Sequence, residues 1–200
     1  MTRIIAGSAR GRRLKVPGSG TRPTSDRIRE SLFASLDARL VSEGRNWGEI
    51  ALCDLWAGSG AIGLEAWSRG AARVLAVEKA KAAVAVIAGN ITDLGAGGVV
   101  EVQRADVSSL VASPPPGGPF QIVVADPPYD YDDESLRADL DKARASGWFA
   151  GDAVIVVERG SPRGHGRGSG STDPLPSGVD VIDRRAYGDS VLWYGLASGE

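Results

Sequence analysis

The sequence predicts an α/β fold with a mostly parallel sheet, an antiparallel ending and a basic N-terminal hairpin. Short apolar runs alternate with helical segments between residues 50 and 158. Such alternation is typical of βαβ units, in which helices cover both faces of a parallel sheet. The ending differs, because the last two apolar runs are separated only by a short turn at Gly188-Asp189. These two strands are therefore expected to pair antiparallel at a sheet edge.

The first part of this pattern begins with a helix. Thr24 or Ser25 is suited to cap it, and apolar residues from Ile28 to Leu36 lie on one face. Apolar runs then predict strands, and segments that stop at Gly70 and Gly95 predict helices, because glycine readily adopts the left-handed conformation at a helix end. The expected order is strand 50–56, helix 60–69, strand 73–78, helix 80–94 and strand 99–103.

The second part continues the alternation after a proline-rich loop at 114–119. A further segment, Ser161–Gly178, is rich in Gly, Ser and Pro and is interpreted as a mobile loop. The expected order is strand 120–125, helix 133–146, strand 153–158, strand 179–186 and strand 190–196.

Length and composition exclude several classes of protein. The 200 residues, 42% hydrophobic and 24% charged, suit one domain with a small appendage. No apolar run approaches the roughly 20 residues of a membrane span and no signal peptide opens the chain, so a cytoplasmic protein without a membrane partner is expected. A single histidine and a single cysteine, Cys53, make neither a disulfide nor an ordinary zinc site, so no metal is expected.

The net charge of −2 conceals a basic arm. Residues 1–29 carry a net charge of +7, which leaves −9 for the remainder. Strand-like alternation on both sides of Gly7–Gly11 predicts a hairpin, although a solvated tail is the alternative. A basic arm on an acidic body is typical of contact with nucleic-acid phosphates. We predict an arm over residues 1–24 and a main domain over 25–200. The basic side chains assigned to nucleic acid are Arg3, Arg10, Arg12, Arg13, Lys15, Arg22, Arg27 and Arg29.

A glycine pattern, Gly58-x-Gly60-x-x-Gly63, lies between the strand at 50–56 and its helix. In dehydrogenases this pattern holds a pyrophosphate, and by itself it leaves a dinucleotide or S-adenosylmethionine open. Glu78 suits the ribose hydroxyls of either ligand. Asp54 distinguishes the two ligands, because a carboxylate there repels the pyrophosphate of a dinucleotide but suits a ligand with an ammonium and a sulfonium.

Asp106, just past the third strand, is placed to bind an adenine amino group. An acid at a strand end also has an ordinary alternative as a helix cap or a solvated group, which is expected for one of Asp54, Glu78 and Asp106.

The segment Asp126-Pro127-Pro128-Tyr129 follows the apolar strand at 120–125. Both prolines lack an N–H group, so the chain must leave the sheet in an extended conformation. The Asp126 carboxylate and the Pro127 carbonyl are suited to accept the two N–H groups of an exocyclic base amine, and Tyr129 is suited to stack on a base splayed from its neighbours. The nitrogen lone pair then points at a methyl donor. A plain turn after a strand is the alternative.

Ligands of an open α/β sheet bind beyond the carboxyl ends of the strands, where the strand order reverses. If the strands at 50–56 and 120–125 are neighbours there, the glycine pattern and Asp126–Tyr129 face one crevice. Methyl donor and amine acceptor are then expected to meet in it.

The chain resembles the RsmD-type family of 16S ribosomal RNA (guanine-N2)-methyltransferases over nearly its whole length. The arm followed by Arg-Pro-Thr-x-x-Arg-x-Arg-Glu is the most specific feature, and Trp56 stands where many members have Phe. The resemblance rests on Arg3–Leu14, Arg22–Phe33, Asp54–Ala66, Val77–Lys79 and Asp126–Tyr129.

This resemblance implies a class I, Rossmann-like methyltransferase with a seven-stranded sheet whose final strand is antiparallel. It implies an enzyme that acts on a guanine amine of 16S rRNA in the small ribosomal subunit, with the arm binding the RNA. A monomer is expected. It places catalysis at Asp126, Pro127, Pro128 and Tyr129. It places S-adenosylmethionine at Asp54, Trp56, Ala57, Gly58, Ser59, Gly60, Glu78, Lys79, Asp106 and Val107.

Two other functions stay open at this point. A DNA adenine-N6 or cytosine-N4 methyltransferase would use the same Asp-Pro-Pro-Tyr segment, but 200 residues leave little room for a target-recognition domain. A non-catalytic RNA-binding assembly factor would keep the fold without the reaction.

Overall fold

The computed structural model describes residues 2–18, 26–160 and 173–198, and these form two compact units, 1–105 and 106–200. The N-terminal hairpin lies in the first unit. The boundary predicted at residue 24 falls within 19–25, outside the described residues, as does the predicted cap at Thr24 or Ser25.

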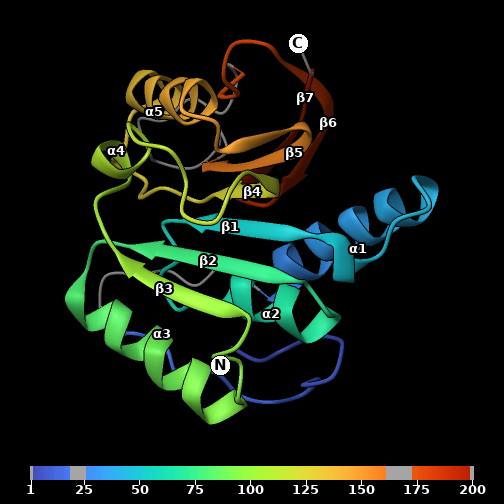
Figure 1. Cartoon of the computed structure of the whole chain (residues 1–200), viewed down its shortest axis with the longest axis vertical. Helices are drawn as coiled ribbons and strands as arrows, with labels where there is room; N and C mark the ends of the chain where they lie inside the picture. Colours follow the sequence, from blue (N-terminus) through green and yellow to red (C-terminus); the bar gives the residue numbers. More distant parts are fainter. Residues whose placement is uncertain (1, 19–25, 161–172, 199–200) are drawn as a thin grey trace. The chain divides into compact units, whose positions relative to one another are not determined.

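The first unit is a three-stranded parallel sheet with helices packed on it. β1 pairs with β2, where Cys53 lies opposite Leu75, and β2 pairs with β3, where Ala76 lies opposite Val102. Figure 1 shows α2 and α3 beside these strands. The elements are α1 (Asp26–Ser42), η1 (Trp47–Glu49), β1 (Ala51–Leu55), α2 (Ala61–Arg69), β2 (Arg73–Glu78), α3 (Lys81–Leu94) and β3 (Val100–Arg104).

Glycines set the ends and the spacing of the helices in this unit. Gly70 (φ 105°) and Gly95 (φ 72°) end α2 and α3 in the left-handed conformation, which confirms the predicted stops. At Gly63 a Cβ atom would lie 2.8 Å from Cγ1 of Val74. The third glycine of the pattern thus lets α2 pack directly against β2.

The N-terminal arm forms a short antiparallel hairpin that packs on the first unit. Ile4 N–H donates to the Arg12 carbonyl and Leu14 N–H to the Thr2 carbonyl, each at 2.9 Å. Instead of regular strands it has one isolated bridge, between Arg3 and Arg13. Ile4 and Leu14 are buried, and Figure 1 draws the dark blue hairpin beside α2 and α3. The described part of the arm is therefore a packed element and not a solvated tail.

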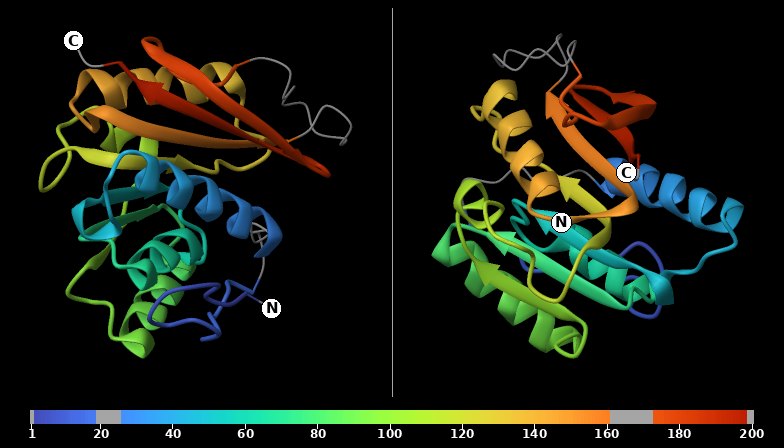
Figure 2. Two further views of the ribbon diagram at one scale, coloured as in Figure 1. Left: turned by 90° about the vertical axis from the view of Figure 1, so that its right-hand side faces the viewer. Right: turned by 45° about the horizontal axis from the view of Figure 1, so that its top comes forward.

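The second unit has a parallel pair of strands followed by an antiparallel pair. Its order is β4-β5-β7-β6, in which β4 and β5 are parallel and both β5–β7 and β6–β7 are antiparallel, as predicted. Both views of Figure 2 show the orange β5 beside the red β7. The elements are α4 (Val107–Leu110), β4 (Phe120–Ala125), α5 (Asp133–Ala145), β5 (Phe149–Gly160), β6 (Val179–Tyr187) and β7 (Ser190–Ala197).

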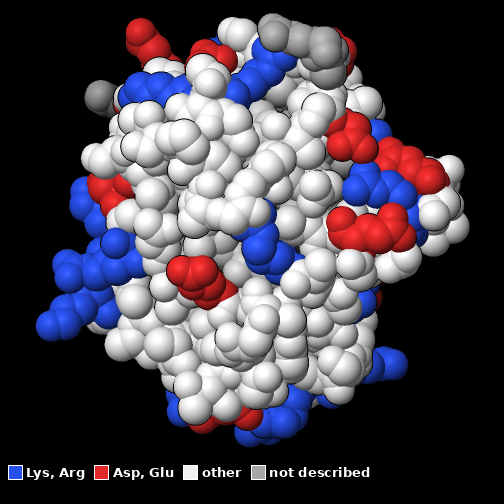
Figure 3. All heavy atoms as spheres, viewed as in Figure 1, with Lys and Arg blue, Asp and Glu red and all other residues white. Residues whose placement is uncertain are grey.

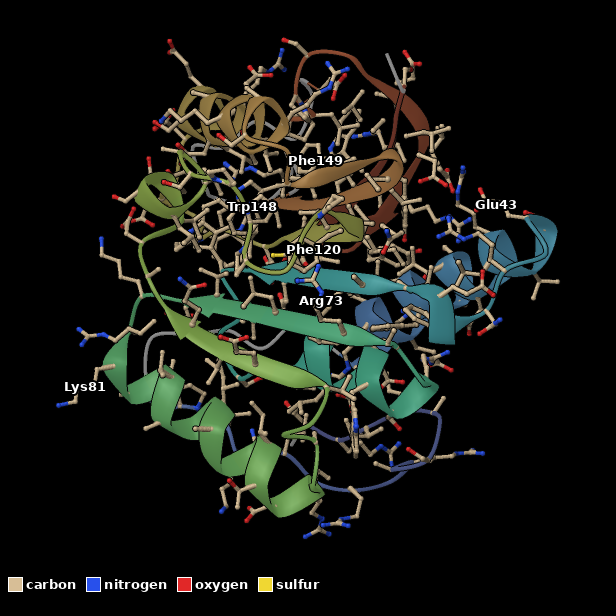
Figure 4. The ribbon with its side chains drawn as sticks, viewed as in Figure 1. Glu43, Arg73, Lys81, Phe120, Trp148 and Phe149 are labelled. Carbon is tan, nitrogen blue, oxygen red and sulfur yellow. The ribbon has the colours of Figure 1, made fainter. Side chains whose placement is uncertain are left out.

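Aromatic and polar anchors fix the loops of this unit. Phe120 stacks on Trp148 with ring centroids 5.8 Å apart, and both rings are fully buried (Figure 4). Trp148 Nε1 donates to the Ser113 carbonyl at 2.7 Å and so holds the start of the predicted proline-rich loop.

Of the loop predicted to be mobile, Ser161–Gly178, residues 161–172 lie outside the described part. Its last residues are attached to α5 by a hydrogen bond from Arg144 to the Ser177 carbonyl at 2.7 Å. Leu175 is buried, and a Cβ atom at Gly195 of β7 would lie 2.7 Å from its Cδ1. No helix in the described ranges is long and apolar enough to cross a membrane.

Candidate cofactor and active site

The turn between β1 and α2 has a strained backbone. Trp56 has a φ of 61°, the one positive value among the described non-glycine residues, and Gly58 and Gly60 have values of 57° and 76°. A bulky residue in the left-handed region is unfavourable, and such strain persists mainly at functional sites. Two backbone hydrogen bonds hold the turn. Ala57 N–H donates to the Val77 carbonyl at 2.9 Å, and Gly60 N–H donates to the Ala57 carbonyl at 2.8 Å.

Glu78, at the end of β2, contacts this glycine loop (residues 56–60) directly. One carboxylate oxygen accepts Gly58 N–H at 2.9 Å and the other accepts Ala80 N–H at 2.7 Å. Each carboxylate oxygen has two lone pairs, so both remain able to accept ligand hydroxyls. The predicted role of Glu78 in binding a ribose is compatible with this fixed position.

Asp54 is less accessible to a ligand than the sequence predicts. Its side chain is buried, and Oδ2 accepts Gly63 N–H from α2 at 3.2 Å. Asp54 therefore joins the end of β1 to the first turn of α2. With Glu78 it places two carboxylates at the glycine loop, where a pyrophosphate would be repelled and a cationic ligand attracted.

The other residues predicted for the cofactor differ in exposure. Ala57 and Ser59 are buried, whereas the Lys79 side chain is exposed. In the second unit, Asp106 is the N-terminal cap residue of α4 and is half-buried, and Val107 after it is buried.

The Asp126–Tyr129 segment leaves the end of β4 as predicted. Asp126 is half-buried and Pro127 buried, whereas Pro128 is exposed and the Tyr129 side chain is 53% exposed. Tyr131 N–H donates to the Pro128 carbonyl at 2.9 Å and closes a turn. The segment thus presents an acceptor carboxylate and an accessible ring within a few residues.

A partly buried network that the sequence did not predict supports the chain after Tyr129. Asp139, on α5, accepts the hydroxyl of Tyr131, Ser108 Oγ at 2.8 Å and Lys142 Nζ at 3.0 Å. Arg159, on β5, donates to the Tyr131 carbonyl at 2.6 Å. Burial and the bond to Asp139 raise the pKa of Tyr131 to about 12, so its hydroxyl keeps its proton at a pH at which an ordinary tyrosine loses it.

Most of the basic side chains assigned to nucleic acid are exposed on the hairpin and α1. Arg3, Arg10, Arg13 and Arg27 are exposed. Arg12 and Lys15 are also exposed, although each contacts Asp93 of α3, Arg12 through the main-chain carbonyl at 2.9 Å and Lys15 through the carboxylate at 2.7 Å. Figure 3 shows basic side chains at the lower edge of the molecule, where Figure 1 draws the hairpin and the end of α3.

The prediction that Arg29 binds nucleic acid is wrong, because its side chain is buried. Arg22 lies outside the described residues. Arg29 has no exposed surface, and Nη2 donates to the Arg3 carbonyl and pairs with Asp26 at 3.0 Å. Burial lowers the pKa of its guanidinium. A side chain in this position offers nothing to a phosphate, so Arg29 anchors the hairpin to α1 instead.

The strained glycine loop with its two acids, the Asp-Pro-Pro-Tyr segment after β4 and the antiparallel ending define a class I methyltransferase. The family model described as "Conserved hypothetical protein 95" matches residues 2–195, and the chain belongs to this family. The predicted resemblance to RsmD-type enzymes is thereby confirmed.

Relatives and solved structures agree with this assignment. "Ribosomal RNA small subunit methyltransferase D" of Escherichia coli K12 is 40% identical over 157 residues, which is 78% of this chain and 73% of the relative. The Haemophilus influenzae protein of the same name is 32% identical over 163 residues, 78% of this chain and 77% of the relative.

The solved structure of Escherichia coli yhhF has a TM-score of 0.80 at 32% identity and covers 99% of this chain and 98% of its own. A structure from Thermus thermophilus has a TM-score of 0.69 at 28% identity and covers 99% of both chains. The predicted fold class, a mostly parallel seven-stranded sheet with an antiparallel ending, is confirmed. The methyltransferase relatives and this fold imply a cofactor of the S-adenosylmethionine type.

Proposed function

We propose that this protein transfers a methyl group from S-adenosylmethionine to the exocyclic N2 amine of a guanine in 16S rRNA of the small ribosomal subunit. The observation that carries the proposal is Asp126-Pro127-Pro128-Tyr129 at the end of β4, in a chain 40% identical to a small-subunit rRNA methyltransferase. The protein would work in the cytoplasm as a monomer and without a metal.

The first unit contributes most of the proposed cofactor site. Trp56–Gly60 would lie against the cofactor, with Glu78 accepting the ribose hydroxyls and Lys79 at the rim. Asp106 and Val107 are the residues proposed to bind the adenine. The donor set fits, because Asp54 and Glu78 are carboxylates fixed at the loop and favour a cationic ligand over an anionic one. When bound, S-adenosylmethionine supplies an electrophilic methyl group on a sulfonium.

The proposed chemistry activates a weak nucleophile. The lone pair of an exocyclic amine is delocalised into the base, so the nitrogen attacks poorly while it is planar. The Asp126 carboxylate and the Pro127 carbonyl accept its two N–H groups and favour a tetrahedral nitrogen. Transfer of the methyl group would form a C–N bond at the expense of the C–S bond of the cofactor, and Asp126 or water would take the proton that the nitrogen loses. Alignment of the lone pair with the methyl carbon supplies much of the acceleration.

Tyr129 is proposed to hold the base during this reaction. Its exposed ring offers a face on which a guanine splayed from the RNA can stack, and such unstacking costs a few kcal/mol. The exposed arginines of the hairpin and α1, with Lys15, are proposed to bind the phosphates around the target.

The test is methyl transfer from labelled S-adenosylmethionine to unmodified small subunits, free 16S rRNA and duplex DNA, followed by mass spectrometry of the nucleosides. We expect N2-methylguanine in the ribosomal RNA. Label on adenine N6 or cytosine N4 of the DNA would favour a DNA methyltransferase. Tight RNA binding without any transfer would favour an assembly factor.

A further inference from the structure

Asn90, on α3, connects two segments that lie far apart in the sequence. It is only 2% exposed, its Oδ1 accepts Lys15 N–H at 2.9 Å, and its Nδ2 donates to the Lys15 carbonyl at 2.9 Å and the Ser59 carbonyl at 3.2 Å. The paired contacts to Lys15 fix which end of the amide is the donor. One buried side chain thus joins the basic hairpin to the glycine loop.

The hairpin is fixed at its other end by buried polar groups of α2. Glu65 accepts the N–H groups of Ile5 and Ala6, at 2.7 and 3.0 Å, and has no exposed surface. Ser68 accepts Ala9 N–H at 2.9 Å. At Gly7 (φ 81°) a Cβ atom would lie 1.8 Å from the Ser68 carbonyl oxygen, so only glycine permits this approach.

The glycine loop depends on its neighbours to keep its shape. A strained turn such as the one at Trp56 persists only where surrounding contacts impose it. Glu78 holds Gly58 from β2, and α3 supports the other side. On that side Ile87 contacts Gly60, where a Cβ would lie 3.1 Å from Cγ2, and Asn90 binds the Ser59 carbonyl one turn further along.

We propose that the docked hairpin is also a support of the cofactor site, and that Asn90 is the positioning residue that transmits this support to the glycine loop. The identity of the cofactor, S-adenosylmethionine, rests on the proposed function. The affinity for the cofactor then depends on the docking of the hairpin even in the absence of RNA. By reciprocity, bound cofactor makes the hairpin harder to undock.

Two matched pairs of variants test this. Gly7→Ala undocks the hairpin, whereas Gly11→Ala introduces a side chain at a similar φ of 82° into open space. Asn90→Ala removes the link, whereas Thr92→Ala removes an exposed hydroxyl that contacts only its own helix. Asn90→Asp keeps the acceptor for Lys15 N–H and loses both bonds that Nδ2 donates, to the Lys15 and Ser59 carbonyls. Gly7→Ala, which leaves Asn90 in place, covers the case in which an Asn90 variant fails to fold.

The readout is the Kd for S-adenosylmethionine measured by titration calorimetry without RNA. We expect Gly7→Ala and each Asn90 variant to weaken binding about tenfold, the effect of one lost buried hydrogen bond. Gly11→Ala and Thr92→Ala should leave it unchanged. In turnover, the KM for the cofactor should rise while kcat at saturation is kept. The double variant Gly7→Ala/Asn90→Ala should be no weaker than either single variant, because both break one chain of contacts.

Unchanged cofactor affinity in the folded Gly7→Ala and Asn90→Asp proteins would overturn the proposal, as would additive effects in the double variant. Failure of the proposed function is seen separately, as absence of S-adenosylmethionine binding in the unaltered protein. In that case, hydrogen exchange at Gly60 N–H, which donates to the Ala57 carbonyl, tests whether the hairpin supports the glycine loop. Faster exchange in Gly7→Ala than in Gly11→Ala supports the link, and equal exchange refutes it.

Discussion

Asp126 and Asp130 lie close together in the chain but in different surroundings. Asp126 is half-buried at the end of β4, whereas Asp130 is exposed. Replacing Asp126 by Asn keeps the size and turns one acceptor oxygen into a donor that meets the N–H of the target amine. We expect kcat to fall by about 10²- to 10³-fold, the usual loss for one preorganised hydrogen bond. Single-turnover methyl transfer measures this.

The affinity for the cofactor should be retained in the Asp126→Asn protein, because Asp126 is assigned to the acceptor base. Asp130→Asn is the matched control and should keep the rate. Full activity of Asp126→Asn would contradict the role assigned to its carboxylate.

The raised pKa of Tyr131 predicts that the folded protein loses stability at high pH. Its pKa is about 12 in the folded protein and about 10 when unfolded, so the folded state holds the phenol proton more tightly. This stabilisation is complete below pH 10 and is lost as the pH rises through 12. Tyr131→Phe removes the bond to Asp139 and should lower the unfolding free energy at pH 7 by about 1.5–3 kcal/mol. Urea unfolding of both proteins should show the difference shrinking above pH 10, and a constant difference would rule out this coupling.

At the scale of single residues, the sequence indicated the residues that are proposed to react, but it did not indicate the side chains that hold their segments in place. Asp126–Tyr129 and the glycine pattern are local motifs, so their chemistry is visible in a short stretch of sequence. Asn90 and Asp139 act through partners in distant segments, and nothing beside them marks that role. Arg29 was misassigned for the same reason, since a charge in a basic stretch does not reveal that it is buried.

At the scale of elements, Gly63 and Gly89 offer a matched comparison. Both lie inside helices, α2 and α3, but a Cβ at Gly63 would be 2.8 Å from Val74, whereas nothing lies within 4 Å at Gly89. Gly63→Ala should therefore cost about 1–3 kcal/mol through overpacking of α2 on β2. Gly89→Ala should stabilise by about 0.5–1 kcal/mol, because alanine favours the helix. Denaturant unfolding measures both, and equal effects would refute the close packing.

The elements were predictable where local signals agree with long-range pairing. Gly70 and Gly95 end their helices as expected, because the C-cap conformation is a local property. β5 extends over Phe149–Gly160, further than the predicted 153–158. Its added ends pair with distant residues, Phe149 with Phe120 and Gly160 with Ser190, and this pairing outweighs the low strand propensity of Gly151-Asp152.

At the scale of the whole molecule, positive charge is concentrated in residues 1–29, at +7 against −9 for the remainder. The structure makes the described part of this segment a packed hairpin and a helix, which keep six basic side chains exposed while Arg29 is buried. A docked arm presents its charges in fixed positions, so it loses less conformational entropy on binding than a disordered tail would.

The salt dependence of RNA association tests this distribution of charge. Each phosphate contact by Lys or Arg releases counterions and adds about 0.7 to the slope of log affinity against log salt for single-stranded RNA. Replacing Arg10, Arg12 and Arg13 by Ala should weaken binding to a 16S rRNA fragment and reduce the slope by about 2. Filter binding between low and moderate salt measures it.

The triple Lys variant at the same positions is the control for that measurement. It keeps the charge, so it should keep the slope, even though Lys lacks the planar fork of Arg. A slope that drops equally in both variants would show that the hairpin's fold matters and not its charge. An unaltered slope in the Ala variant would show that these side chains do not contact phosphates, and the binding face would then have to be sought on the exposed arginines of β6, Arg184 and Arg185.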